Sequence, residues 1–181
     1  MELLIGEPLA LDLVNTRTRD FDALDTPEGF GIWLDRQAGR LTPSEGPFTA
    51  DDLGAVRDLR AHVEAAVGAV RRGEGPSLET VEAINVAMRA APAYAHLDVV
   101  GDALTKGARR DGDRRARLLA QLAEAAADLL TDPAAGRIRA CEGPGCRMIF
   151  LPAHPRRRWC SPELCGNRVR VARHYRRHKP E

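Results

Sequence analysis

Aromatic residues are scarce in this chain: they make up 4% of its 181 residues, although hydrophobic residues as a class make up 44%. A core must therefore be built mainly from Ala, Leu and Val, which favours packed helices over an extensive sheet. No apolar run approaches the ~20 residues that a membrane-spanning helix needs, and the start of the chain lacks the basic and long apolar segments of a signal peptide. We therefore expect a soluble, cytoplasmic protein with no membrane partner.

Groupings that carry catalysis are missing as well. The chain has no glycine-rich phosphate loop, no His/Glu metal pair and no nucleophile beside a base, and His62 and His96 are isolated. These absences indicate that the protein is not an enzyme.

Formal charge is nearly balanced over the whole chain, at +1, but the two ends differ. Residues 137–181 hold 12 Lys+Arg against 3 Asp+Glu, whereas residues 1–136 hold 15 against 23. Such a split indicates two units with different partners. The alternative is that the basic end docks on the acidic part of its own chain.

Apolar residues recur with helical spacing through residues 1–131. Pro8 predicts the start of a short helix that carries residues 9–16, although Leu9, Leu11 and Leu13 also alternate as they would in a strand. Start signals predict four further helices, after Thr26-Pro27, after Thr49 with Asp52 as a capping box, after Ser77, and after Asp111 and Asp113.

Two further expectations concern residues 77–110. The helix after Ser77 should bury one face, made of Leu78, Val81, Ile84 and Met88. Residues 94–105 should form a small antiparallel strand pair that turns at Gly101-Asp102.

Polar residues interrupt the first predicted helix on one side. Asp12, Asn15 and Thr16 share an arc opposite its apolar residues. We expect them to line a small-molecule pocket in which Trp33 is a stacking wall. The alternative is that they face solvent or cap a neighbouring element.

All cysteines of the chain lie in one short stretch, at Cys141, Cys146, Cys160 and Cys165. Two C-x4-C pairs separated by a short loop match a structural zinc site of four thiolates. Two disulfides are the alternative, but an intracellular setting argues against them. His154 is a conceivable substitute ligand, although four cysteines leave no place for it.

Segments 147–151 and 157–159 are expected to pair as a hairpin around Pro152 to Pro155, with a helix after Cys165. So small a unit needs a bound metal to be stable. We therefore predict an α+β protein. It comprises a mostly helical domain with a small β-pair (residues 1–131, the helical domain), a linker (132–137), and a treble-clef-like, four-cysteine zinc finger of hairpin and helix (138–181, the finger).

The tetrapeptide Cys165-Gly166-Asn167-Arg168 resembles the signature of the CGNR zinc-finger family. The resemblance covers roughly Arg139 to Lys179, including Trp159-Cys160-Ser161. The opening LALDLVNTR, with the Trp33-Leu34 helix after it, resembles the ABATE domain that commonly precedes this finger. The resemblance implies a transcription regulator whose N-terminal domain senses a ligand.

A helix over residues 166–178 would have two distinct faces. One carries Cys165 and apolar residues together with Arg168, which we expect to be structural and to hydrogen-bond carbonyls or an acidic residue. Asn167 is expected to bond locally, with a base edge as the alternative. The opposite face, with two arginines before Cys160, supplies the predicted nucleic-acid contacts: Arg170, Arg173, His174, Arg177, Arg157 and Arg158.

These observations favour a zinc-dependent, DNA-binding transcription regulator, modulated by a small-molecule effector or by forming a homodimer. The alternatives are a solvated basic surface with no nucleic-acid role, and a protein-interaction module whose finger docks on an acidic surface.

Overall fold

The computed structural model describes residues 4–42 and 46–171. The helical domain contains α1 (Leu9–Val14), α2 (Pro27–Asp35), α3 (Ala50–Arg71), α4 (Leu78–Ala90), the strands β1 (Ala93–Val100) and β2 (Ala103–Arg110), and α5 (Arg114–Thr131). A short 3-10 turn, η1 (Ala135–Arg137), leads to β3 (Arg139–Ala140), β4 (Ile149–Phe150) and one π-helical turn, η2 (Pro162–Gly166). This confirms the predicted fold class.

The helices begin where the sequence signals predict. Thr26, Ser77 and Asp113 each accept a hydrogen bond from the backbone N–H three residues later, and Thr49 forms a reciprocal capping box with Asp52. Such a cap contributes about 1 kcal/mol. These starts fix the lengths of the helices that form the core.

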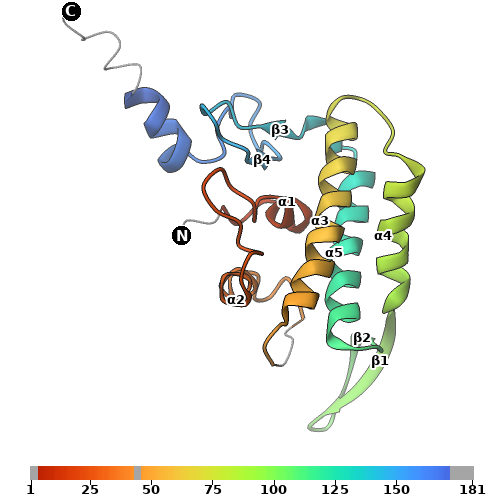
Figure 1. Ribbon diagram of the computed structural model, residues 1–181. Coiled ribbons are helices and arrows are strands. Elements are labelled where there is room, and N and C mark those ends of the chain that lie inside the picture. Colours follow the sequence, from red (N-terminus) through yellow and green to blue (C-terminus); the bar gives the residue numbers. More distant parts are fainter. Residues whose placement is uncertain (1–3, 43–45, 172–181) are drawn as a thin grey trace, which may run out of the picture.

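The core lies where α3, α4 and α5 run side by side and α1 crosses them (Figure 1). Helix α1 is short, yet its residues from Ala10 to Val14 are all buried. It packs against α3 and α5 on one side and approaches β4 on the other. Asp12 of α1, and Asn15 and Thr16 directly after it, are therefore enclosed by protein. No helix in the described ranges is long and apolar enough to cross a membrane.

The predicted buried face of α4 is partly wrong. Ile84 is buried, but Leu78 is 88% exposed and Val81 is 39% exposed. The face of α4 that packs on the core consists instead of Thr80, Ile84, Ala87 and Met88, which are spaced by four, three and one residues. The polar residue Thr80, with its hydroxyl bonded to Ser77 Oγ, occupies the inner position that the sequence pattern gave to Val81.

The strand pair in the helical domain is confirmed and longer than expected. All eight residues of β1 pair with β2, from Ala93 opposite Arg110 to Val100 opposite Ala103. Gly101 has φ +62°, as the first central residue of a type II′ turn requires. This hairpin extends beyond the ends of α4 and α5, away from the finger (Figure 1).

The strand pairing predicted within the finger is wrong. Strand β4 pairs with β3, which precedes Cys141, and segment 157–159 forms no strand. Pro152 and Pro155 each lack the N–H that a hairpin ladder needs. Segment 157–159 instead contributes one backbone contact, from Glu142 N to the Arg158 carbonyl at 3.0 Å.

Candidate metal centre and nucleic-acid interface

The four cysteines meet at one point in the finger. Their sulfur atoms all lie within 4.8 Å of one another, and Cys146 Sγ lies 3.9 Å from Cys160 Sγ. A tetrahedral zinc site with Zn–S bonds of about 2.3 Å has S–S edges of about 3.8 Å. All four are free cysteines rather than disulfides. The cluster therefore has the ligand type, number and nearly the spacing of a closed zinc site.

The two halves of the cluster are shaped by tight turns. Between the first pair, Gly145 has φ +68° and Cys146 N donates to the Gly143 carbonyl at 3.0 Å. A Cβ added at Gly143 would lie 2.8 Å from Cys165 Sγ, so only glycine fits there. In the second half, Gly166 N and Cys165 N both donate to the Ser161 carbonyl, which produces the wide turn that holds Cys165.

Hydrogen-bond donors surround the sulfur atoms. Cys141 Sγ accepts from Gly143 N at 3.4 Å and from Cys160 N at 3.3 Å, and Cys165 Sγ accepts from the Arg168 guanidinium at 3.2 Å. Donors of this kind stabilise and orient thiolate ligands. The surroundings therefore suit sulfur in its ionised, metal-binding form.

The thiols compete with one another for ionisation. A hydrogen bond from the Cys160 thiol is the main cause that lowers the pKa of Cys146 to about 5, and the same bond raises the pKa of Cys160. Burial raises the pKa of Cys165 to about 11. Four like charges so close together need a cation, and a divalent metal supplies the positive charge that lets all four thiols ionise.

Two family models match the chain. One, described as "Putative stress-induced transcription regulator" and named ABATE, matches residues 7–133. The chain belongs to the ABATE family. The second model, the CGNR zinc finger, matches residues 137–178, so the cysteine cluster is the zinc site of that finger. The family description implies a role in transcription control rather than catalysis. No curated protein matches the chain.

The CGNR signature spans the junction between η2 and the terminal helix. Residues 167–171 are helical, and Arg168 and Arg170 on this segment are exposed. Arg168 was predicted to support the finger by bonding a carbonyl or an acidic residue. Its guanidinium instead donates to the sulfur of the zinc ligand Cys165. Asn167 Oδ1 accepts from the Arg170 guanidinium, a local bond. Arg173, His174 and Arg177 lie outside the described residues.

Arg157 and Arg158, both predicted to contact nucleic acid, have different surroundings. Arg157 donates to Glu7 Oε1 at 2.6 Å and to the Trp159 carbonyl at 3.1 Å, and its guanidinium lies 4.3 Å from the Phe150 ring centroid. Arg158 pairs with Glu142 at the surface, where both side chains are about half exposed. Arg158 thus remains open to a partner, whereas Arg157 is largely occupied within the protein.

The finger is joined to the ABATE domain along the free edge of β4. The carboxamide of Asn15 donates to the Ile149 carbonyl at 2.9 Å and accepts from Ile149 N at 3.0 Å. Glu7 Oε2 accepts from Leu151 N at 2.9 Å. Side chains thus replace a third strand, and both are buried. Sequence reasoning missed Glu7, whose only signal was an acid placed directly before Pro8.

Apolar packing and a second ion pair reinforce this junction. Ala135 and Ile138, in and beside the predicted linker, belong to the same buried core as α1, α3 and α5, and so does Ile149 of β4. Arg147 of the finger approaches Glu64 of α3 at 3.5 Å. The basic finger therefore contacts acidic residues of its own chain, which was the alternative explanation of the uneven charge distribution.

The four residues predicted to bind a ligand are all almost completely buried. Asp12 accepts from the backbone N–H groups of Gly6 and Glu7 and from Arg40 at 2.6 Å. Thr16 donates to the Leu13 carbonyl and accepts from Arg60. Together with Asn15, these side chains have protein partners. Their role toward a ligand stays a prediction.

Trp33 lies in an aromatic cluster. It stacks on Phe30 with ring centroids 5.8 Å apart, and Phe30 meets Phe48 edge-on at 5.1 Å. The indole N–H of Trp33 has no hydrogen-bond partner in the described part of the chain. Phe48 forms part of the wall of the pocket described next, whereas Trp33 does not line that pocket. Trp33 contacts Phe30, which in turn contacts Phe48.

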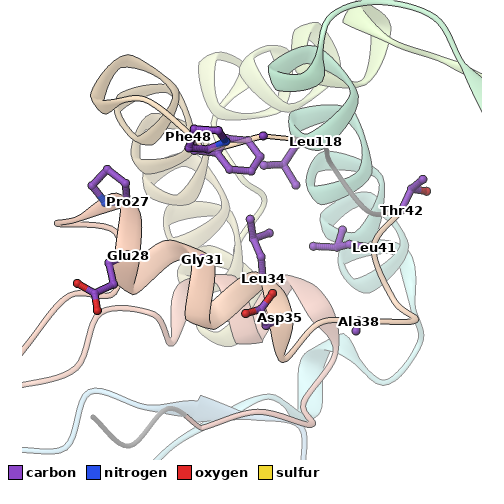
Figure 2. A pocket seen from close by; sticks show the side chains of 12 residues that line it. Pro27, Glu28, Gly31, Leu34, Asp35, Ala38, Leu41, Thr42, Phe48 and Leu118 are labelled. Carbon is purple, nitrogen blue, oxygen red and sulfur yellow. The ribbon is translucent and has the colours of Figure 1, made fainter.

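A cavity of about 580 Å³ lies between α2, the segment that follows it, and α5. Figure 2 shows Leu34, Leu41 and Leu118 pointing into it beneath Phe48. Its size and mainly apolar wall are typical of small-molecule sites. Sequence reasoning missed this pocket, because segment 41–48 showed only the prolines and glycine of a loop.

Proposed function

We propose that this ABATE protein is a DNA-binding transcription regulator whose CGNR finger contacts the duplex. The observation that carries the proposal is the exposure of finger arginines around a closed zinc site. Those exposed among the described residues of the finger are Arg139, Arg147, Arg156, Arg158, Arg168 and Arg170. Glu142 and Glu163 are the acidic residues within the described part of the finger. A surface of this composition attracts a polyanion.

The zinc site would have a structural role. Its four thiolates fill a tetrahedral site, so no position remains for a substrate. Their role is to fix the turn from which the terminal helix starts, and Cys165 lies two residues before that helix. Cytoplasm is the proposed location, where thiols stay reduced and available to metal.

Selection from a random pool of DNA duplexes tests the proposal. The zinc-loaded full chain should enrich related sequences, and Arg170→Ala should weaken binding and reduce the salt slope by about 1. Arg89→Ala is a matched control, because Arg89 is an exposed arginine of α4 that pairs with Glu82. Absence of binding by a zinc-loaded chain would contradict the proposal and favour a protein-interaction module.

We also propose that an effector acts through the pocket in Figure 2. Leu41 lines the pocket, and its neighbour Arg40 donates to Asp12 and to the Glu7 carbonyl. Asp12 in turn holds the backbone N–H of Glu7, whose carboxylate contacts the finger through Leu151 and Arg157. A contiguous set of polar contacts thus connects the pocket wall to the finger. Through these contacts the helical domain (1–131) would act, across segment 132–137, on the finger (138–181).

A side chain placed in the pocket serves as a tethered ligand for testing this coupling. Gly31 lines the pocket, and a Cβ there meets no atom within 4 Å, so Gly31→Leu should place a side chain in part of the pocket without a close contact at Cβ. We expect DNA affinity to change at least about 5-fold, the lower range of allosteric coupling. Arg40→Met should remove that change. Equal DNA affinity for Gly31→Leu and the unaltered chain would contradict the coupling.

A further inference from the structure

The β1–β2 hairpin has one polar and one apolar face. On the polar face, Asp98 pairs with Arg109 at 2.5 Å and lies 3.6 Å from His96, while Tyr94 donates to Asp111. The opposite face carries apolar side chains with two cations of β2 among them: Ala93, Ala95, Leu97 and Val99 of β1, and Leu104, Lys106, Ala108 and Arg110 of β2, with Lys106 directly opposite Leu97. The hairpin is therefore amphipathic, and Tyr94, Asp98 and Arg109 on its polar face already have partners.

The apolar face is bare. Leu97 is 64% exposed, and Val99 and Leu104 are each 73% exposed. An isolated two-stranded hairpin is marginally stable in water, whereas three or more strands with an apolar face are stable. The arrangement thus calls for additional strands from outside the described chain.

The two free edges of the hairpin differ in charge. Strand β2 carries Lys106, Arg109 and Arg110 and no acid, so pairing it with a copy of itself would bring like charges together. Strand β1 carries one acid, Asp98, and one histidine, His96. Edge β1 is therefore the one that can accept an identical strand.

Strand β1 is self-complementary about Leu97. In an antiparallel pair of two copies centred there, Leu97 lies opposite Leu97, Ala95 opposite Val99, and His96 opposite Asp98 on both sides of the two-fold axis. The hydrogen-bonding direction also fits. Thr105 Oγ1 donates to the Asp98 carbonyl, which therefore points toward β2, so the backbone groups of Leu97 point to the free edge.

We propose that β1 is the dimerisation edge of this protein and that its occupant is β1 of a second copy. The two hairpins form a four-stranded antiparallel sheet whose apolar face is centred on the two Leu97 side chains, with Lys106 of each copy beside them. The inference rests on the proposed function in that a homodimer is expected for a DNA-binding regulator, and it adds the surface through which that dimer forms. Dimerisation itself does not require DNA. The finger lies away from the hairpin (Figure 1), which leaves it free in the dimer.

Two leucines of the same apolar face provide the test. In the zinc-loaded full chain without DNA, Leu97→Lys places two ammonium groups opposite each other at the axis, each beside Lys106 of its own hairpin, and should weaken dimerisation about 100-fold. Leu104→Lys puts the same charge on β2, which is the outer strand, and should leave the dimer nearly unchanged. Sedimentation equilibrium measures both dissociation constants, and zinc content with helical circular dichroism verifies folding.

A second measurement gives the register. A short bis-maleimide should cross-link Leu97→Cys chains efficiently and Leu104→Cys chains poorly, because three strand spacings, about 14 Å, separate the outer strands. A monomeric unaltered chain, or equal effects at the two leucines, would overturn the inference. A monomer that binds DNA would leave the proposed function standing, whereas a dimer that follows this pattern but binds no DNA would refute only that function.

Discussion

Replacing Asn15 should detach the finger from the ABATE domain. Its carboxamide satisfies both backbone groups of Ile149, with bonds of 2.9 and 3.0 Å, in a site where Asn15 is 1% exposed. Asn15→Leu keeps a side chain of similar size but leaves one donor and one acceptor unpaired. Each unpaired buried group costs about 1–3 kcal/mol. We expect the free energy of unfolding to fall by about 3 kcal/mol, with some water entry reducing the sum.

Urea denaturation measures this loss, and amide hydrogen exchange locates it. Exchange at Ile149 should accelerate in Asn15→Leu, while exchange in the middle of α3 should change only as far as global stability does. Glu7→Gln is the matched comparison, since it keeps an acceptor for Leu151 N but loses the charge that faces Arg157. A loss below about 0.5 kcal/mol with unchanged exchange at Ile149 would refute the assignment of Asn15 to the finger junction.

Three further predictions concern the metal site and a buried ion pair. Gly143→Ala should lower zinc affinity at least about 10-fold in chelator competition, because its Cβ would lie 2.8 Å from Cys165 Sγ; unchanged affinity would show that the turn can shift. Chelation of zinc should abolish tertiary order in the finger but leave most helical circular dichroism, since α3 and α5 pack independently of the cysteines. Burial raises the pKa of Asp22, but hydrogen bonds from Arg60 and Leu24 N outweigh it and lower the pKa overall. The ionised Asp22 therefore stabilises the folded protein above the unfolded pKa of about 3.9, and this contribution is lost as pH falls through the lower folded pKa. Asp22→Asn should therefore flatten the acid limb of stability against pH, and an unchanged limb would contradict the assignment.

Local signals in the sequence were sufficient for the starts of the helices and for the zinc ligands. Thr49 and Asp52 form their capping box within one turn, and the two C-x4-C pairs need only tight turns and a short loop. Such features depend on neighbours in the chain. They could be predicted because no distant segment has to be known.

Contacts between distant segments were not predictable in this way. Asn15 and Ile149 are 134 positions apart, and nothing in either segment names the other. The same holds for Arg157, whose position in an arginine run suggested a phosphate contact while Glu7 and the Phe150 ring occupy it. The pairing of β4 with β3 was missed because the prolines after β4 were interpreted as a hairpin turn.

The exposed face of the β1–β2 hairpin shows a different limit. The strand pair and its turn at Gly101-Asp102 were predicted, but one sequence does not say whether an apolar face is covered by its own chain or by another molecule.

The most direct test of the regulator is the salt dependence of DNA binding by the zinc-loaded full chain, followed by fluorescence anisotropy. With four phosphate contacts, the affinity should fall about 100-fold between 50 and 200 mM salt, as about four counterions are released. Arg170→Ala should lower the slope by about 1, and Arg89→Ala should leave it unchanged. Binding that does not vary with salt, or no binding by a zinc-loaded chain, would contradict the account.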